Sequence, residues 1–461
     1  MGQGRRTNGP GPARSCGRLR VQDPAPATIM SDYHERVPTG GPTPVTSTVS
    51  AVRPAGRGNR TALVFANIAH FYSHVFMLLY PTVVLALEVA FERPYGELLS
   101  LSVVGFVLYG VAALPAGWLG DKWSAPGMLA IFFFGTGTAG ILAGFASGPL
   151  GIAVALAAIG LFSSIYHPVG TAYIVANAVA RGKALGINGV FGTAGIAATP
   201  LIAGGLTALF GWRAAFVVPG AICIATGIAF LFVMRGMAAG ARERKPAVPY
   251  DIPKSQAVRG LAILGVTVLC VGLLAQAHTV VLPKVFAVRA PDIVEWAGLA
   301  GAGGLASAAL AIGALGQLAG GWLADRYRLT LVYPLVYVLF IPVAVIAAGV
   351  SGLPLVIFAG LIMFLITSSL PAENSLVARY CPDRWHATAY GSKFVLGLGV
   401  SSAAIPAAGA IFDATGGFWW MFVGMAGIAA IVCVAASFLP RAGEIKRAGT
   451  RSTGPVAGPA E

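Results

Sequence analysis

Residues 117–123, GWLGDKW, and residues 321–327, GWLADRY, are near-copies of each other. Each stretch ends a long apolar run and closes with an acidic residue followed by a basic one and an aromatic one. The two stretches lie 204 residues apart. Because a repeat at a fixed offset indicates repeated structural units, the sequence predicts two similar halves.

The same offset recurs elsewhere in the chain. Three more pairs lie 203 to 205 residues apart, namely His74 with His278, Pro168 with Pro371, and Gly186 with Gly391. Agreement at four places supports two halves that carry their helices in the same order.

Composition places the chain in a membrane. Of 461 residues, 56% are hydrophobic and only 10% are charged, whereas a soluble domain carries about 25% charged residues. Many apolar runs exceed the ~20 residues that a helix needs to cross a bilayer, and their continuity excludes the alternating pattern of barrel strands. The predicted fold class is therefore all-α, a polytopic membrane protein with twelve transmembrane helices in two pseudo-symmetric six-helix bundles. The helices are expected at 62–90, 96–119, 128–146, 149–177, 184–210, 213–234, 259–283, 295–323, 330–350, 353–378, 387–412 and 417–439.

Polar segments set the expected domain boundaries. We expect an N-terminal bundle at 61–234 and a C-terminal bundle at 259–439, joined by a cytoplasmic linker at 235–258. The segments 1–60 and 440–461 are expected to be disordered cytoplasmic tails, since they are polar and lack apolar runs.

The net charge of +14 does not indicate a nucleic-acid partner, because the basic residues follow the positive-inside rule. On the side of the N-terminus lie 26 Lys and Arg, against 4 on the other side. This predicts a multi-pass protein of the plasma membrane with both termini in the cytoplasm. The excess of 24 Arg over 7 Lys indicates a GC-rich bacterium and hence an inner membrane. The five cysteines show no paired spacing and are interpreted as free thiols.

The two near-copies resemble the loop signature of the major facilitator superfamily, which joins helices 2–3 and, in weaker form, 8–9. The resemblance covers about residues 60–440 and implies parallel repeats with a substrate site between them near the midplane. The matching positions are expected to form a conformational latch, and they are Gly117, Asp121, Lys122, Gly321, Asp325 and Arg326.

Within this latch, Gly117 and Gly321 would let helices approach closely. Asp121 and Asp325 would lie at the membrane edge, where a carboxylate can meet the positive N-terminal end of a neighbouring helix. The later part of the signature is missing. Residues 124–126 (SAP) and 328–330 (RLT) stand where the family has a glycine and two basic residues.

Polar residues inside a membrane span are costly, so they are candidates for function. In the first helix Asn67, His70 and His74 share one face, because they are spaced three and four residues apart. Two histidines at this spacing suit zinc, but no third ligand is evident from the sequence and no HExxH frame is present. We interpret the three as a polar stripe that faces the bundle interior; histidines hydrogen-bonded to backbone are the alternative, and no metal or cofactor is predicted.

Other candidates lie in later helices. His167 precedes Pro168, which bends the helix and leaves a backbone carbonyl without its helical hydrogen bond. The His167 ring is expected either to bond that carbonyl in a structural role or to titrate, since the unperturbed pKa of histidine, about 6.5, suits a proton carrier. Glu373 and Lys393 are expected either to form an ion pair that joins two helices or to line the cavity and carry charge; the third alternative is that Lys393 snorkels toward the cytoplasm. The remaining candidates for the substrate and proton pathway are Asn188, Gln276 and His278. Glu88 and Asp413 are expected at the membrane interface.

Residues 195–205 resemble a degraded form of the helix-5 antiporter motif, with Pro200 and Gly204 kept but Thr199 and Ala203 in place of glycines. In the family this motif accompanies exporters that exchange substrate for protons. Residues 149–177 lack the buried basic residue that such antiporters carry in helix 4, so His167 is the nearest titratable substitute. The pattern Asn67, His70, His74 with residues 80–81 (YP) loosely resembles fosmidomycin-resistance-like exporters.

The sequence therefore predicts a secondary active transporter that exports a small organic molecule, driven by protons, through alternating access. It is expected to act as a monomer. An importer of a small organic anion stays open, with His74, His278 and Lys393 offering positive charge. A non-transporting membrane sensor is the alternative from another class. An enzyme is not predicted, because no nucleophile–base motif or phosphate loop is present.

Overall fold

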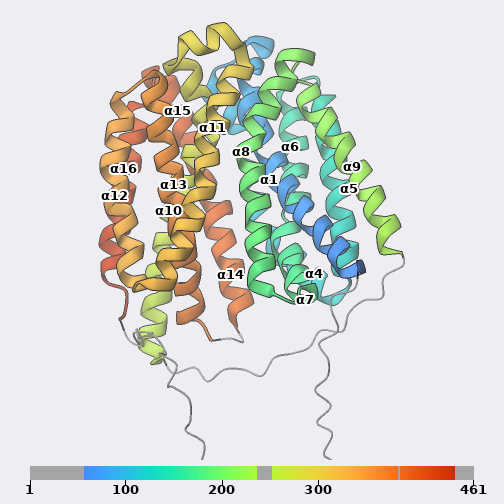
Figure 1. The fold of residues 1–461 in the computed structure, drawn as a ribbon. Helices are drawn as coiled ribbons and strands as arrows, with labels where there is room; N and C mark the ends of the chain where they lie inside the picture. The colour runs from blue at the N-terminus through green and yellow to red at the C-terminus, as the bar shows by residue number, and fades with distance from the viewer. Residues whose placement is uncertain (1–56, 236–251, 383–384, 442–461) are drawn as a thin grey trace, which may run out of the picture. The chain divides into compact units, whose positions relative to one another are not determined.

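The structure is a computed structural model, which describes residues 57–235, 252–382 and 385–441 (Figure 1). Within these residues every regular element is a helix, and twelve helical spans are long and apolar enough to cross a membrane. The prediction of an all-α fold with twelve transmembrane helices is confirmed. Most of the two expected tails and of the expected linker lies outside the described residues.

The N-terminal half comprises α1 (Arg57–Phe91), α2 (Tyr95–Ser100), α3 (Val103–Val111), α4 (Ala113–Lys122), α5 (Ala125–Gly144), α6 (Pro149–Ser163), the π-helix η1 (Tyr166–Gly170), α7 (Thr171–Asn177), α8 (Arg181–Phe210) and α9 (Ala214–Met234). The C-terminal half comprises α10 (Lys254–Arg289), α11 (Pro291–Arg326), α12 (Leu329–Gly349), α13 (Gly352–Tyr380), α14 (His386–Phe394), the π-helix η3 (Val395–Gly399), the 3₁₀ helix η4 (Val400–Ala403), α15 (Ala404–Thr415) and α16 (Trp419–Ser437). Helix α10 thus begins inside the range expected for the linker.

Four spans depart from a regular α-helix, and only the bend at Pro168 was expected from the sequence. One of the four is the eighth span, which is kinked within α11 at Gly298, where φ is 58°. The second span consists of α2, α3 and α4, the fourth contains η1, and the eleventh contains η3 and η4. In η1 the cause is local, since Pro168 has no N–H for the helical ladder. Its repeat partner Pro371 lies within the continuous helix α13. π-Segments occur frequently at functional sites, which draws attention to η1 and η3.

The departure from the family signature after α4 has a structural explanation. Ser124 has extended backbone and is the N-cap of α5, where its hydroxyl accepts a hydrogen bond of 3.1 Å from the Gly127 N–H. Pro126 lies in the first turn, where a missing N–H costs nothing. These residues start a helix at the position of the signature's glycine and basic residues.

Small residues bring the helices together, but at one expected position the prediction was wrong. A Cβ on Gly117 would lie 3.0 Å from the Pro168 side chain, so this glycine does contact a neighbouring helix. A Cβ on Gly321 would meet nothing within 4 Å, whereas one on Gly320 would collide with the Ser368 backbone. Consecutive helical residues point about 100° apart because a turn holds 3.6 residues, so the close approach in the second half falls one residue earlier.

The two halves meet along several helix pairs, and α8 and α11 lie side by side between them (Figure 1). The backbone N–H of Leu201 in α8 donates to the Ser307 hydroxyl in α11 at 2.9 Å. Helix α3 approaches η3 so closely that a Cβ on Gly110 would lie 2.6 Å from the Cα of Gly399. These contacts position polar groups of both halves near one another.

Candidate functional site

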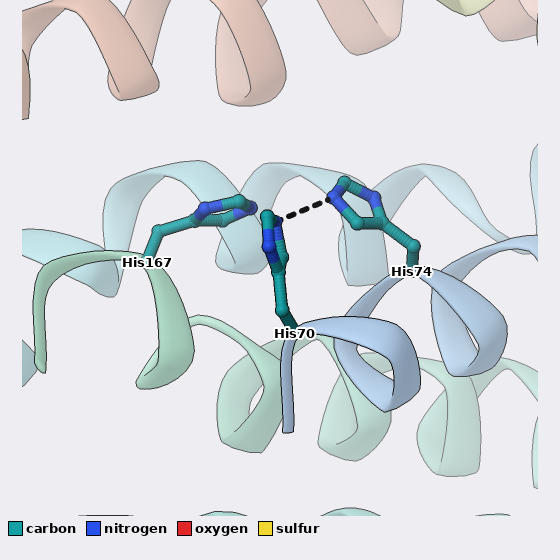
Figure 2. A group of neighbouring side chains, drawn as sticks. All are labelled: His70, His74 and His167. Atoms are coloured by element: carbon teal, nitrogen blue, oxygen red, sulfur yellow. Dashed lines mark hydrogen bonds between the residues drawn. The ribbon is translucent and has the colours of Figure 1, made fainter. Parts of the chain in front are cut away.

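Three histidines form a compact group in the N-terminal half (Figure 2). The Nε2 atoms of His70 and His74 are 3.3 Å apart, and the ring of His167 has its centroid 5.5 Å from each of the other two. One ring nitrogen of each histidine lies within 4.8 Å of those of the others. All three side chains are partly exposed. The polar stripe predicted on the first helix therefore gains a third histidine, from the fourth span.

The histidines come together for local reasons. His70 and His74 are one helical turn apart on α1, so their rings lie on the same face. His167 lies in η1, and its Nε2 is 2.7 Å from the Tyr109 hydroxyl of α3. The Ser73 hydroxyl lies 3.4 Å from the same Tyr109 oxygen, so this network connects three spans.

Asn188 of α8 fixes the orientation of His70. The His70 Nδ1 lies 2.7 Å from the Asn188 carbonyl oxygen. A carbonyl only accepts, so Nδ1 carries the proton and Nε2 of the neutral ring offers a lone pair. The Asn188 amide donates to Asn67 Oδ1 at 3.0 Å and to the Tyr166 hydroxyl at 2.6 Å. Tyr166 in turn stacks on His70 with centroids 4.7 Å apart.

The glycine periodicity of α8 makes this packing possible. A Cβ on Gly192 would collide with the His70 ring, and one on Gly195 would lie 2.6 Å from the Phe71 carbonyl oxygen. Any larger residue at these two positions would push α8 away from α1. Gly192 and Gly195, two of the glycines that recur every third residue along α8, therefore permit close packing against α1.

A second polar group lies in the C-terminal half. Lys393 Nζ is 2.7 Å from Glu373 Oε1, and the Tyr333 hydroxyl donates to Glu373 Oε2 at 2.7 Å. The Glu373 side chain is 1% exposed and that of Lys393 is 15% exposed. Lys393 also donates to the Asn374 side chain. The structure thus brings together the two residues that the sequence offered as a pair.

One aromatic contact links the two groups. The ring of Phe394, at the end of α14, stacks on His167 with centroids 5.0 Å apart and planes inclined by 23°. Phe394 directly follows Lys393, and η3 begins at the next residue. One short segment of the eleventh span therefore contacts the histidines with one side chain and Glu373 with the other.

Two further candidates lie apart from the histidine group. His278 is fully buried and its Nε2 is 3.0 Å from the Ala359 carbonyl oxygen, so this ring contacts α13 within its own half. Gln276 is buried and donates to the Leu398 carbonyl of η3 at 3.4 Å. Neither side chain contacts the three histidines, although His278 is the repeat partner of His74.

The latch residues lie at the ends of α4 and α11. Gly117 and Gly120 pack against η1, where a Cβ on Gly120 would lie 2.8 Å from Val169. The charged members Asp121, Lys122, Asp325 and Arg326 are exposed. The Arg326 guanidinium lies 4.6 Å from the centre of the Trp322 ring.

Sequence reasoning missed several polar contacts between the halves. Glu88, expected at the interface, forms an ion pair of 2.7 Å with Lys284 of α10. The Asp413 carboxylate of α15 accepts hydrogen bonds of 3.0 and 3.1 Å from the backbone N–H of Gly96 in α2. Tyr109, Tyr166, Tyr333 and Phe394 were missed as well, because a single aromatic residue in an apolar helix gives no signal in the sequence.

Twelve membrane-length helices in two repeated halves, with polar groups of both halves linked near their contact, are the architecture of a multi-pass membrane protein. A sequence model of the Major Facilitator Superfamily matches residues 63–392, and the chain belongs to this family. It is thus a multi-pass membrane protein and a secondary transporter of that superfamily. The family that it matches consists of transporters that take small molecules as substrates.

Comparison with solved structures shows the same fold. A bacterial homologue of the human lysosomal transporter Spinster, in an inward-facing and unoccupied conformation, aligns with a TM-score of 0.66 at 14% identity, covering 84% of this chain and 97% of that one. The Escherichia coli fucose:proton symporter FucP, in a form with a single substitution, aligns with a TM-score of 0.55 at 15% identity, covering 84% and 100%. A comparison with curated protein sequences found no match.

Proposed function

We propose that this transporter exports a small organic molecule in exchange for protons, by alternating access of one central site. In this proposal the chain acts as a monomer in the plasma membrane of a bacterium, with both termini in the cytoplasm. The basic residues counted above support that orientation. The histidine group and Asn188 form the N-terminal wall of the substrate site.

The observation that carries the proposal is the buried ion pair of Glu373 and Lys393. A carboxylate with 1% exposure is retained at high cost unless it is paired and hydrogen-bonded. The charged and titratable groups that face it are Lys393 and Tyr333, with Tyr337 beyond them bonded to Ser369 at 2.8 Å. When Lys393 moves away, the Glu373 carboxylate loses its counter-charge and binds a proton instead. Movement of Lys393 is thereby coupled to binding and release of a proton.

Phe394 supplies the connection to substrate. A molecule that enters beside His167 would displace the stacked Phe394 ring, because the two rings are already in contact. Since Lys393 is the preceding residue, its ammonium would move away from Glu373. The π-segment η3 that follows gives the helix a place to bend.

The inter-half contacts fit alternating access. In the proposed orientation Glu88–Lys284 and Gly96–Asp413 close the outer end, while Asp121 and Asp325 lie at the cytoplasmic end. Asp121 is proposed to help close that end by capping a nearby helix. Substrate and protons would alternately reach the centre from each side as one half moves against the other.

The direction of transport is proposed from α8. Pro200 and Gly204, the residues kept from the antiporter motif, lie against α11, where a Cβ on Gly204 would be 2.5 Å from the Leu299 carbonyl oxygen. The motif therefore lies in the contact between α8 and α11, where one half is proposed to move against the other. An importer of a small organic anion is the second candidate, favoured by the partly exposed ammonium of Lys393, which directly precedes the Phe394 ring stacked on His167.

Flux in inside-out vesicles with an acidic lumen tests the proposal. A panel of drugs and organic anions is added outside, and a pH-sensitive dye in the lumen reports proton movement. We expect substrate uptake together with alkalinisation of the lumen, and loss of alkalinisation in Glu373→Gln. Glu97→Gln is the matched control, because Glu97 pairs with Arg93 at an exposed site. Substrate movement without proton movement in the unmodified chain would overturn the exporter proposal. Acidification of the lumen as an added anion enters it, with proton and anion moving in the same direction, would establish the importer.

A further inference from the structure

We propose that His70, His74 and His167 form a binding site for one divalent first-row transition metal ion with the preferences of Zn²⁺. The site goes beyond the transport activity proposed above, and metal binding to it depends neither on the direction of transport nor on proton coupling. The two histidines of α1 alone would not make such a site. The third histidine, from η1, completes it (Figure 2).

The distances between ring nitrogens fit metal ligands. In a tetrahedral site with Zn–N bonds of about 2.0–2.1 Å, two ligating nitrogens are about 3.3 Å apart. The Nε2 atoms of His70 and His74 have this spacing, at 3.3 Å. All three ligand atoms lie within 4.8 Å of one another, so small rotations of His167 would complete the set.

The surroundings orient these rings as metal-bound histidines are oriented. A ligating histidine usually donates its other ring N–H to a carbonyl or carboxylate, which fixes the tautomer. His70 does so, because Nδ1 donates to the Asn188 carbonyl, and the lone pair of its Nε2 points at His74 Nε2, where an ion would replace the hydrogen bond between the two rings. His167 is held through Nε2 by the Tyr109 hydroxyl at 2.7 Å, and in the tautomer whose Nε2–H donates to that oxygen the lone pair lies on Nδ1.

The chemistry of the donor set selects the ion. Imidazole nitrogens suit Zn²⁺, Cu²⁺, Ni²⁺ and Co²⁺ and do not suit Mg²⁺ or Ca²⁺, which prefer oxygen. Three neutral histidines with an open fourth position are an established arrangement for Zn²⁺. Because the three side chains are partly exposed, the fourth position can take water or a donor atom of a transported molecule.

Metal binding to the purified full-length chain tests the site. The chain carries an affinity tag without histidines and is freed of metal with a chelator. Co²⁺ is then titrated while its visible d–d absorption is recorded, and Zn²⁺ binding is measured by calorimetry. We expect about one ion per chain and the intense spectrum of four-coordinate Co²⁺, which Zn²⁺ displaces. His74→Gln and His167→Gln should each lower affinity by about tenfold or more. His278→Gln is the matched control and should bind as the unmodified chain does.

A second variant keeps the test decisive if a histidine variant does not fold. Tyr109→Phe keeps the ring but removes the hydroxyl that orients His167, so it should weaken binding by about tenfold. Absence of stoichiometric binding, a six-coordinate Co²⁺ spectrum, or equal affinity in the folded His74 variant would overturn the proposal. These measurements use neither a gradient nor a transported molecule, so their failure would leave the flux experiment unaffected, and failure of flux would leave the metal site standing.

Discussion

Glu88 and Lys284 join the two halves through an ion pair of 2.7 Å, although they are 196 residues apart in the chain. The side chains are 22% and 13% exposed, so solvent screens the pair only in part. Lys284 also lies 4.9 Å from the centre of the Phe412 ring and 5.2 Å from that of Tyr95. One ammonium thus contacts a carboxylate of the N-terminal half and an aromatic ring of each half.

Removing either charge should destabilise the conformation seen here. We expect Glu88→Gln and Lys284→Met each to make a cysteine introduced at Ser100 more reactive toward thiol reagents, because this end opens more often. In a double-mutant cycle on thermal unfolding the two changes should show an interaction of about 1 kcal/mol. The exchanged pair Glu88→Lys with Lys284→Glu should restore only part of it, since glutamate at 284 loses the aromatic contacts. Additive single changes would show that the pair contributes nothing to closure.

Neighbouring glycines of α11 should respond differently to the same change. Gly320→Ala places a Cβ against the Ser368 backbone and should cost about 1–3 kcal/mol as overpacking. Gly321→Ala meets nothing within 4 Å and should stay within about 0.5 kcal/mol of the unmodified chain. Thermal unfolding in detergent measures both. Equal midpoints for the two variants would contradict the packing described here.

Asp121→Asn should weaken transport while leaving expression and the unfolding temperature unchanged. Asp121 is exposed at the end of α4, so the change removes a charge without creating a cavity. The proposed helix-capping contact depends on that charge. Glu97→Gln, an exposed carboxylate at the opposite end of the same span, is the control for loss of a surface charge. Transport at the full rate in Asp121→Asn would rule out the latching role.

The number of transmembrane helices and the division into two halves could be predicted, because a long apolar run identifies a membrane-spanning helix and the second half of the sequence repeats the first. Pro168 indicated the irregularity at η1, but η3 contains no proline and its position against α3, where Gly110 and Gly399 meet, left no signal in the sequence. The repeat also misled at one position, because His74 meets His70 while its partner His278 bonds the Ala359 carbonyl. Equivalent sequence positions need not make equivalent sites once the two halves carry different neighbours.

The sequence identified most of the polar residues of the candidate site, but it did not show which of them lie together. His167 carried a signal, a polar ring before a proline inside a span, but nothing in the sequence placed it beside His70. That placement depends on the bend in η1 and on the small residues of α8, among them Gly192. Glu373 and Lys393 were predictable as a pair, because charged side chains inside a membrane span are costly unless they pair with an opposite charge.

Phe394→Leu should separate substrate movement from proton movement. Leucine keeps the site apolar but cannot stack on His167 as the phenyl ring does at 5.0 Å. In the vesicle assay we expect fewer protons moved per substrate, with binding of substrate less affected. Phe418→Leu is the matched control, because Phe418 stacks on Phe412 at 4.9 Å and 24° without contacting the histidines. A normal ratio in Phe394→Leu would exclude this ring as the link.

Removing Lys393 alone should damage the protein more than removing both members of its ion pair. Lys393→Met leaves the Glu373 carboxylate buried without its counter-charge, which typically costs about 3–5 kcal/mol. The double change Glu373→Gln with Lys393→Met leaves no buried charge, and the amide still accepts the Tyr333 hydroxyl through its oxygen. We therefore expect a low unfolding temperature for Lys393→Met and nearly normal stability for the double variant. If the pair serves proton movement rather than stability alone, the double variant should fold, bind substrate and still fail to alkalinise the vesicle lumen. Normal alkalinisation in that stable double variant would assign the pair a purely structural role.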